Sequence, residues 1–326
     1  MKAIVRDRYG SPDLVHLTDL PTPVPEGGEA LVRVKAASVN TADLDQLRGR
    51  PPAIRLFSGL TRPKVRRLGL DIAGIVEAVG EDVADLKPGD AVWADMFPAG
   101  TGAFAEYVCA RADVFKPMPG HLGFDVAATI PHSASLALQA LRARAGVKPR
   151  DRVLIVGAGG CVGPFAIQIA KAYGAVVTAV DDTSKLDFMS RAGADHVVDY
   201  TKEKVTRNGE QYDFIVDIAA RTSVFSYRRS LASGGVFVQV SRTLAGFFSA
   251  AVQGELATLA SDKKMGVFFW EPNRRADLDE LGRLMEQGAL VPIIDRRYPL
   301  AAVADALRHK EQGLAQGKPV IEIDLP

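Results

Sequence analysis

The feature that most constrains the fold is a glycine-rich turn between an apolar strand and a helix. The segment reads DRVLIVGAGGCVGPFAIQIAKAYGAVVTAVDD over residues 151–182. Ala158, Gly160 and Gly163 occupy the three small-residue positions of a dinucleotide-binding turn, with alanine in the first. The backbone of such a turn must approach a pyrophosphate with no Cβ in the way. The helix N-terminus then offers free N–H groups and a positive dipole end to the phosphates.

An acidic residue supports the same interpretation. Asp181 stands at the end of the next predicted strand, where a carboxylate can bond the hydroxyls of a ribose. Two other interpretations remain open. The turn could join a strand and a helix without binding anything, or it could serve a methyltransferase, which also has a glycine-rich turn and an acid after its second strand. The β-rich first third of the chain fits a methyltransferase poorly.

The chain around this turn alternates strands and helices. We predict helices over 134–145, 162–173 and 184–192, each ended by a glycine, and apolar strands between them. The strands are expected at 152–156, 176–180, 197–198, 214–218 and 236–240. Apolar strands separated by amphipathic helices imply an α/β fold, a doubly wound parallel sheet of the Rossmann type.

The rest of the chain has a different pattern of predicted secondary structure. The first third predicts short β-strands, including a bent strand with spaced glycines over 69–80. Residues 48–67 are basic and aperiodic, which is typical of an exposed loop and is also compatible with a lid over a pocket. Residues 244–260 predict an apolar helix packed on the sheet or on a partner subunit, and 276–288 another helix. The tail offers a strand near Arg297, a helix over 301–312 and a last strand at 320–323.

Composition excludes several classes of protein. The length of 326 residues suggests about two domains. Lys and Arg total 40 against 39 Asp and Glu, so we expect no nucleic-acid partner. No apolar run approaches the roughly 18 residues of a membrane span, and the first residues contain no apolar signal stretch, so we expect a cytoplasmic protein with no membrane partner. Cys109 and Cys161 are the only cysteines, which fits a reducing compartment.

At this point the sequence resembles the medium-chain dehydrogenase/reductase superfamily, in its zinc-free quinone oxidoreductase-like branch. The resemblance rests on MKAIVRDRYGSPD, VRVKAASVNTAD, GLDIAGIVEAVG, LKPGDAVWA, GAFAEYV, the glycine-rich turn, AGADHVVDYT and GKPVIEI. It implies a GroES-like β-barrel domain over 1–122 and 296–326, and a Rossmann dinucleotide-binding domain over 123–295. It also implies a cofactor in the cleft between these domains, and a homodimer.

The superfamily has zinc-containing members, and this chain differs from them at the positions that bind the metal. Their catalytic zinc needs an early cysteine and a Gly-His-Glu sequence, where this chain has Ser38-Val39-Asn40 and Gly69-Leu70-Asp71. The structural zinc needs four closely spaced cysteines, which this chain does not have. Its five histidines show no ligand spacing. We therefore predict that the protein contains no metal site and no zinc.

The resemblance also implies catalytic residues. In similar zinc-free enzymes the asparagine of the SVNxxD motif, here Asn40, lies beside the nicotinamide, where an amide can orient the ribose or donate to a developing oxyanion. Asp43 is its companion in the motif, and it can equally be a helix-capping carboxylate. The tyrosine that some enoyl reductases carry is missing from residues 45–65. No residue stands out as a general acid, so we expect a proton from water, or no proton donor at all for a quinone.

The choice between NADH and NADPH stays open. Lys185 and Tyr200 fall where similar NADPH-dependent enzymes place residues near the 2′-phosphate. Asp181 and Asp182 instead repel a phosphate and favour the 2′-hydroxyl of NADH. The predicted cofactor-binding residues are Ala158, Gly159, Gly160, Cys161, Val162, Gly163, Asp181, Asp182, Lys185 and Tyr200.

Four positions depart from the family pattern. Cys161 replaces a glycine of the turn and is either a small packed residue or a reactive thiol. Leu136 replaces a threonine, and His132 and Ser133 are polar where relatives are often apolar. The leading hypothesis is an NAD(P)H-dependent reductase of quinones or α,β-unsaturated carbonyls, with a small-molecule carbonyl or quinone substrate. The alternatives are a zinc-free alcohol dehydrogenase and a dinucleotide-binding sensor or partner protein without useful turnover.

Overall fold

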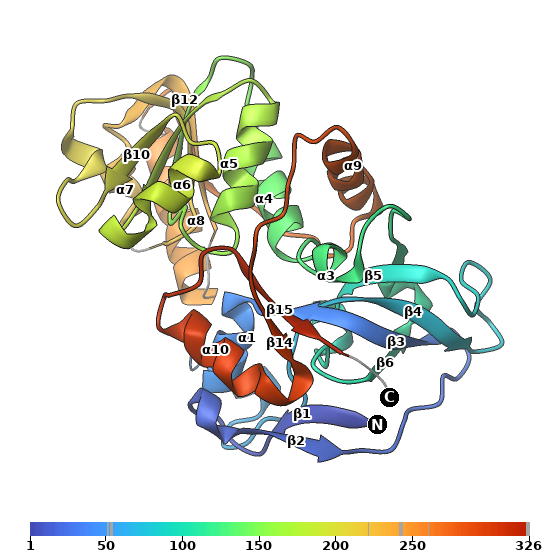
Figure 1. The fold of residues 1–326 in the computed structure, drawn as a ribbon. Coiled ribbons are helices and arrows are strands. Elements are labelled where there is room, and N and C mark those ends of the chain that lie inside the picture. The colour runs from blue at the N-terminus through green and yellow to red at the C-terminus, as the bar shows by residue number, and fades with distance from the viewer. Residues whose placement is uncertain (51, 53–54, 221, 241–243, 260, 324–326) are drawn as a thin grey trace. The chain divides into compact units, whose positions relative to one another are not determined.

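The chain forms two compact units (Figure 1). The computed structural model describes residues 1–50, 52, 55–220, 222–240, 244–259 and 261–323. Unit 1 comprises Met1–Ser135, Pro272–Asp279 and Pro292–Pro326, and unit 2 comprises Leu136–Glu271 and Glu280–Val291. Unit 1 therefore contains both ends of the chain.

Unit 2 is built on a six-stranded sheet in which every neighbouring pair is parallel. Its strands are β8 (Arg152–Val156), β9 (Val176–Asp181), β10 (His196–Asp199), β11 (Tyr212–Asp217), β12 (Leu231–Gln239) and β13 (Lys264–Val267). They lie in the order β10-β9-β8-β11-β12-β13. The order reverses direction between β8 and β11, and ligands of such sheets bind at the carboxyl ends of the strands beside this reversal. The predicted doubly wound sheet is confirmed.

Helices cover both faces of this sheet. α5 (Gly163–Ala172) and α6 (Leu186–Arg191) follow β8 and β9, and α7 (Val224–Tyr227) and α8 (Leu244–Leu259) follow β11 and β12. Because parallel crossovers are right-handed and the strand order reverses at β8, the two pairs of helices lie on opposite faces. α5 packs on β8 and β9, and α8 packs on β13. α4 (Ser133–Arg142) and α9 (Arg275–Glu286) begin in unit 1 and continue into unit 2.

Unit 1 is mainly antiparallel. Its large sheet has the order β14-β15-β3-β4-β5-β7, with β6 also paired to β3, and β1 and β2 form a separate pair. The strands are β1 (Lys2–Arg6), β2 (Val15–Asp19), β3 (Glu29–Ser38), β4 (Asp71–Val79), β5 (Ala91–Asp95), β6 (Tyr107–Arg111), β7 (Lys116–Pro117), β14 (Ile294–Pro299) and β15 (Lys318–Glu322). β15 pairs antiparallel with β3, so the last strand of the chain is joined to the first long one. The β-rich domain predicted for the first third and the end of the chain is confirmed.

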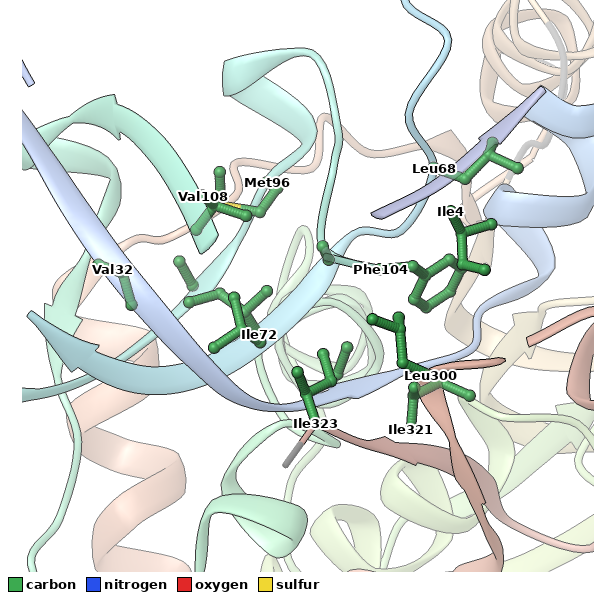
Figure 2. Close-up of a cluster of buried hydrophobic side chains, with 14 of the residues drawn as sticks. Ile4, Val32, Leu68, Ile72, Met96, Phe104, Val108, Leu300, Ile321 and Ile323 are labelled. Carbon is green, nitrogen blue, oxygen red and sulfur yellow. The ribbon is translucent and has the colours of Figure 1, made fainter. Parts of the chain in front are cut away.

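The core of unit 1 unites segments that are far apart in the sequence. Figure 2 shows Ile4 beside Phe104 and Leu300, with Ile321 and Ile323 from the chain end in the same cluster. All of these side chains are buried. Because burial of each contributes about 1.5–3 kcal/mol, the terminal segment is an integral part of the barrel domain.

Short helices complete unit 1. They are α1 (Thr41–Arg48), α2 (Arg55–Ser58), α3 (Phe124–Ala127) and α10 (Val303–Glu311), the last of which packs on α1 and β15. α2 interrupts the basic segment 48–67, part of which lies outside the described residues. Among the described helices none combines the length and apolar character needed to cross a bilayer.

The boundaries of the two units differ from those drawn on the sequence. Residues 123–135, assigned there to the Rossmann domain, lie in unit 1. α3 packs on β3, β4 and β15, because its apolar residues complete the barrel rather than the parallel sheet. Pro272–Asp279 also belongs to unit 1, as does the segment from Pro292.

Candidate functional site

A row of buried polar residues crosses three neighbouring strands of unit 1. In the register of the sheet, Ser38 of β3 lies opposite Asp71 of β4, and Asp71 lies opposite Asp95 of β5. All three side chains are fully buried. Like charges directly opposite one another destabilise a sheet, and buried carboxylates need partners. Both Asp71 and Asp95 therefore need hydrogen-bonding or charged partners.

Lys318, the first residue of β15, provides the cation for Asp71. Its Nζ lies 3.0 Å from Asp71 Oδ2, and it also donates to Asn40 Oδ1 at 2.5 Å and to Ser133 Oγ at 3.1 Å. Its side chain is 1% exposed. A fully buried ammonium is tolerated only when paired and hydrogen-bonded, and these three acceptors meet that condition.

Asn40 is held on both sides of its amide. Its Nδ2 donates to Asp71 Oδ2 at 2.9 Å, while its Oδ1 accepts from Lys318 and from Ser133 Oγ at 3.0 Å. The opposite amide orientation would put N–H groups against an ammonium and an oxygen against a carboxylate, so the charges determine this one. Asn40 is 1% exposed. Its amide, which was predicted to lie beside a nicotinamide, is therefore a fixed part of a buried hydrogen-bond network.

His132 joins the same network from the segment before α4. Its backbone N–H donates to Asp71 Oδ1 at 2.7 Å, and its ring Nδ1 lies 2.7 Å from Asp95 Oδ2. Burial by itself lowers the pKa of His132, but the adjacent Asp95 carboxylate outweighs burial and the net pKa is raised above its ordinary value. When His132 is protonated, its imidazolium is the cation that pairs with Asp95.

Asn273 fixes the position of Asp95. It accepts from the Asp95 backbone N–H through Oδ1 and donates to the Asp95 carbonyl through Nδ2, both at 2.8 Å. The remaining Asp95 oxygen, Oδ1, accepts from the Phe97 N–H at 2.8 Å. Asp95 thus faces His132 in a single orientation.

Asp43 is placed as the capping residue of α1. Its Oδ2 accepts from the Asn40 backbone N–H at 2.6 Å, so the two residues predicted as catalytic form a capping box at the helix start. The Asp43 side chain is fully buried, and burial raises its pKa to about 7. Its predicted catalytic role stays a prediction, and its contacts are those of a helix cap.

The buried Asp43 gives the protein a pH-dependent stability. A carboxyl whose pKa rises on folding destabilises the folded state once the pH exceeds its unfolded value near 4, and the cost is complete above about 7. Asp43→Asn keeps an oxygen for the Asn40 N–H and removes this cost. Urea unfolding should find the variant more stable than wild type by roughly 2 kcal/mol at pH 8, with the difference shrinking toward pH 5. A difference that does not vary with pH would contradict this account.

The second candidate site is the glycine-rich turn of unit 2, at the carboxyl end of β8. Gly157 has a φ of +80°, and a Cβ there would lie 3.0 Å from Ala219, which follows β11. The turn therefore lies where the strand order reverses. A Cβ at Gly163 would lie 2.0 Å from the Ala158 carbonyl oxygen, whereas one at Gly160 would meet nothing nearer than 3.5 Å. Gly163 packs the helix on the turn, and Gly160 presents an open backbone.

The structure brings Asp181 to this turn. Asp181 ends β9, and its Oδ2 accepts from the Gly159 N–H at 2.8 Å, while its Oδ1 accepts from the Asp182 N–H at 2.9 Å. The stem of Lys185 also packs over Gly159, since a Cβ there would lie 2.7 Å from the Lys185 Cβ. The Tyr200 N–H donates to the Asp181 carbonyl at 3.1 Å.

The other predicted cofactor residues line or support the same turn. Asp182 Oδ1 accepts from the Ser184 N–H at 2.9 Å, so it also caps the short helical turn that leads to Lys185. Val162 precedes α5, and its carbonyl accepts from Ala166. Ala158 and Cys161 are buried, and the place of Cys161 is that of a small packed residue. Nine of the predicted residues thus lie on the turn or at the carboxyl ends of β9 and β10, and Lys185 lies on the short helical turn that follows β9.

The described part of the chain offers no cluster of metal ligands. No group of three or more His, Cys, Asp and Glu side chains within those ranges has the arrangement of a metal site. In zinc-containing relatives two segments bind the metal. Here the same two segments provide Asn40 and Asp71, which both accept hydrogen bonds from Lys318 Nζ.

Comparison with known proteins identifies the family. Residues 26–120 match the family described as alcohol dehydrogenase GroES-like domain, and residues 192–321 match zinc-binding dehydrogenase. The mitochondrial NAD(P)H oxidoreductase RTN4IP1 of Bos taurus is 31% identical, covering 99% of this chain and 89% of its own. The chloroplast envelope quinone oxidoreductase homolog of Arabidopsis thaliana is 28% identical over 99% and 98% of the two chains.

Solved structures of similar proteins indicate the same family. The quinone oxidoreductase of Coxiella burnetii superposes with a TM-score of 0.88 at 30% identity, over 99% of both chains. A structure described as an NAD-dependent alcohol dehydrogenase reaches 0.79 at 28% identity, over 99% of this chain and all of its own. Two-domain barrel and Rossmann architecture with this turn defines the medium-chain dehydrogenase/reductases. This chain belongs to that superfamily, in its quinone oxidoreductase-like branch.

Four titratable residues of the polar network were not predicted as site residues. They are Asp71, Asp95, His132 and Lys318. The sequence could have indicated two of them, because Asp71 and Lys318 lie in GLDIAG and GKPVIEI, two segments with the pattern of buried strands. A charged residue in a buried strand needs a partner and is therefore a candidate site residue. Nothing local in the sequence indicates which partners they find, and the pairing depends on strand register.

Proposed function

We propose that the protein is a zinc-independent, NAD(P)H-dependent oxidoreductase that reduces quinones or α,β-unsaturated carbonyls by hydride transfer. The observation that carries the proposal is the open turn of Gly160 at the strand-order reversal, with Asp181 fixed beside it. Open backbone N–H groups at a helix N-terminus suit a pyrophosphate, and a carboxylate after the second strand suits a ribose. The names of the relatives, NAD(P)H oxidoreductase and quinone oxidoreductase, support the same activity.

The residues of this chain would hold the cofactor and prepare the acceptor. The Gly160 backbone and the start of α5 would take the pyrophosphate, and Asp181 the adenosine ribose. The bound dihydronicotinamide would supply a hydride. The rigid network around Asn40 holds fixed dipoles and charges in a dry environment, which is the arrangement that stabilises developing charge on an acceptor oxygen.

The contacts of Lys318 support the zinc-independent form of this activity. Its ammonium already engages Asn40 Oδ1 and Asp71 Oδ2, from the two segments where zinc-containing relatives bind metal. Those oxygens are satisfied by a cation that belongs to the chain. Hydride transfer would then depend on position and on hydrogen bonds rather than on a Lewis acid.

A zinc-free alcohol dehydrogenase is the second candidate, and the NAD-dependent alcohol dehydrogenase structure favours it. It would reduce NAD⁺ with an alcohol and would be insensitive to chelators. A dinucleotide-binding sensor, the third possibility, would bind NADH or NADPH in calorimetry without turnover.

One assay separates these functions. The protein is mixed with NADH or NADPH and a panel of quinones and enones, and absorbance at 340 nm is followed, with the reverse reaction tested on alcohols. The proposal expects oxidation of the cofactor with a quinone or an enone and no effect of chelators. Turnover of alcohols alone, or binding without any turnover, would refute it.

We expect NADH to be preferred over NADPH by about tenfold in kcat/KM, a difference of about 1.4 kcal/mol. Asp181 and Asp182 place two carboxylates at the end of β9, and a 2′-phosphate there would meet like charge. Asp182→Asn keeps an acceptor for the Ser184 N–H and removes one negative charge. It should therefore reduce the ratio of kcat/KM for NADH to that for NADPH several-fold. Asp187→Asn, the same charge change on an exposed position of α6, is the control and should leave the ratio unchanged. A wild-type preference for NADPH would contradict the argument.

The homodimer and the cytoplasmic location stay predictions.

A further inference from the structure

One surface of unit 1 combines exposed apolar side chains with positive charge. Residues 55–67 and the neighbouring turn at 97–101 form it, and we call it the basic apolar surface. Its exposed large apolar side chains, each between 41% and 67% exposed, are Leu56, Leu60, Val65 and Phe97. The two segments are in contact, since a Cβ at Gly100 would lie 3.9 Å from Val65 Cγ2. Single exposed apolar residues are ordinary, but a group of them on one surface marks a place where something binds.

The grouping distinguishes this surface from the rest of unit 1. Elsewhere in the described part of unit 1, the exposed large apolar side chains are Leu17, Val24 and Leu314, which lie on three separate segments of the chain. None of these three adds a second exposed leucine, valine or phenylalanine within its own segment. The basic apolar surface is therefore the part of unit 1 where apolar exposure is concentrated among the described residues.

Hydrogen bonds tie the backbone of this surface to the body of unit 1. The Tyr9 hydroxyl donates to the Gly59 carbonyl at 2.8 Å, and Thr101 Oγ1 donates to the Arg67 carbonyl at 3.0 Å. The segment is thus attached near its middle and at its end while its leucines remain exposed. Burial of those leucines requires a second surface that is supplied from outside unit 1.

The charge of residues 55–67 is entirely positive. The segment reads RLFSGLTRPKVRR, with five basic residues and no acidic one. Arg66 pairs with Asp7 at 2.5 Å, which offsets one of these charges, whereas Arg62 and Lys64 lie exposed beside the apolar side chains. Lys and Arg total 40 against 39 Asp and Glu in the whole chain, so the excess is local. The basic apolar surface therefore attracts an anionic partner in one orientation.

The combination of charge and apolar exposure selects the kind of partner. A single-stranded nucleic acid is bound by basic residues together with aromatic rings on which bases stack, and leucine cannot replace those rings. An anionic lipid bilayer takes both kinds of side chain, because its phosphates attract Lys and Arg while the region below them accepts leucine. The aliphatic stems of Lys and Arg let their charges stay at the headgroups while neighbouring apolar side chains lie deeper.

We propose that the basic apolar surface docks unit 1 on an anionic lipid bilayer. Leu56 and Leu60 enter the boundary between headgroups and acyl chains, and Arg62 and Lys64 lie at the phosphates. The chain lies on the membrane and does not cross it, so the proposal replaces the sequence-based expectation of no membrane partner, which concerned spanning segments. It goes beyond the proposed function, because binding to lipid requires no turnover.

Vesicle flotation tests the proposal on the full-length protein. Vesicles of phosphatidylglycerol and phosphatidylcholine in equal parts are compared with vesicles of phosphatidylcholine alone at about 0.1 M salt, where charges act over about 10 Å. Wild type should float with the anionic vesicles and at least about tenfold less with the neutral ones. Raising the salt to about 1 M shortens that range to about 3 Å and should release most of the bound protein.

A pair of double variants locates the binding surface. Leu60→Gln/Lys64→Gln removes one exposed apolar side chain and one exposed cation. The lost charge alone should weaken binding about fivefold, and both changes together at least about tenfold. Val24→Gln/Lys87→Gln removes the same kinds of side chain from other exposed positions of unit 1 and should bind as wild type does. Thermal unfolding verifies that both variants are folded, and Arg62→Gln, with an expected fivefold loss, replaces the first if it is not.

Three outcomes would overturn the proposal. The first is a wild-type protein that does not float with anionic vesicles. The second is an equal loss of binding in the two double variants, which would place the contact elsewhere. The third is binding to heparin without binding to vesicles, which would assign the surface to a soluble polyanion. None of these measurements depends on oxidation of NADH or NADPH, so failure of the docking surface and failure of the proposed function are distinguished.

Discussion

Lys318→Met is expected to destabilise unit 1 by roughly 3–5 kcal/mol, the cost of leaving a buried ion pair with one partner. Methionine has nearly the same length and fills the same space, so the loss isolates the charge rather than a cavity. Without the ammonium, the Asp71 carboxylate stays fully buried and the Asn40 and Ser133 oxygens lose a donor. Urea unfolding at pH 7 measures the difference, and any residual activity should fall with it because Asn40 loses its fixed orientation.

Lys171→Met is the matched control for this prediction. Lys171 Nζ lies 2.8 Å from Asp195 Oδ1, a shorter approach than that of Lys318 to Asp71, but the two side chains are 37% and 33% exposed. Exposed ion pairs contribute about 0–1 kcal/mol, so this variant should unfold almost as wild type does. Equal losses in the two variants would mean that burial does not set the cost, and would contradict the interpretation of the network.

Gly163→Ala is expected to lower the midpoint of thermal unfolding and to abolish cofactor binding. A Cβ at this position would lie 2.0 Å from the carbonyl oxygen and 2.3 Å from the carbonyl carbon of Ala158. These are backbone atoms, so no side chain can rotate away, and the turn must separate from α5. We expect a loss of roughly 3 kcal/mol, at the upper end of the range for overpacking. Differential scanning fluorimetry and NADH titration measure the two effects.

Gly160→Ala separates the fold from the binding site. A Cβ there would lie 3.5 Å from the Gly157 oxygen, an ordinary contact, so the variant should fold with a midpoint close to that of wild type. If the turn is open because a pyrophosphate approaches it, NADH should bind at least about tenfold more weakly. Unchanged NADH affinity in a folded Gly160→Ala protein would show that the open backbone does not face the cofactor.

The cofactor half of the protein was predictable because its signals are local. A parallel strand, a turn of Gly160 and Gly163, and a helix follow one another within residues 151–182. Each requirement acts between near neighbours, since a tight turn and a close helix contact depend on the residues at those positions. What the sequence did not indicate is the role of Gly157, whose left-handed backbone shapes the turn against Ala219.

The polar network of unit 1 was only partly predictable, because its members are distant in the sequence. The family resemblance predicts Asn40 and Asp43 from one short motif, and the structure makes them a capping box. Asn40 also bonds Asp71, and Lys318 reaches both across an antiparallel pairing of the last strand with β3. His132 and Ser133 are polar where relatives are often apolar, but nothing near them in the sequence indicates Asp95 as a partner of His132.

By itself the sequence determined the α/β class, the dinucleotide turn and the acid beside it, since hydrophobic period, turn chemistry and helix ends are properties of short segments. Only the tertiary structure decided that Asp71 and Asp95 face each other, that Lys318 and the ring of His132 contact them, and that both chain ends complete one barrel. The physical reason is that strand register places each side chain on its face of the sheet. A shift of one residue would turn every one of these charges away from its partner.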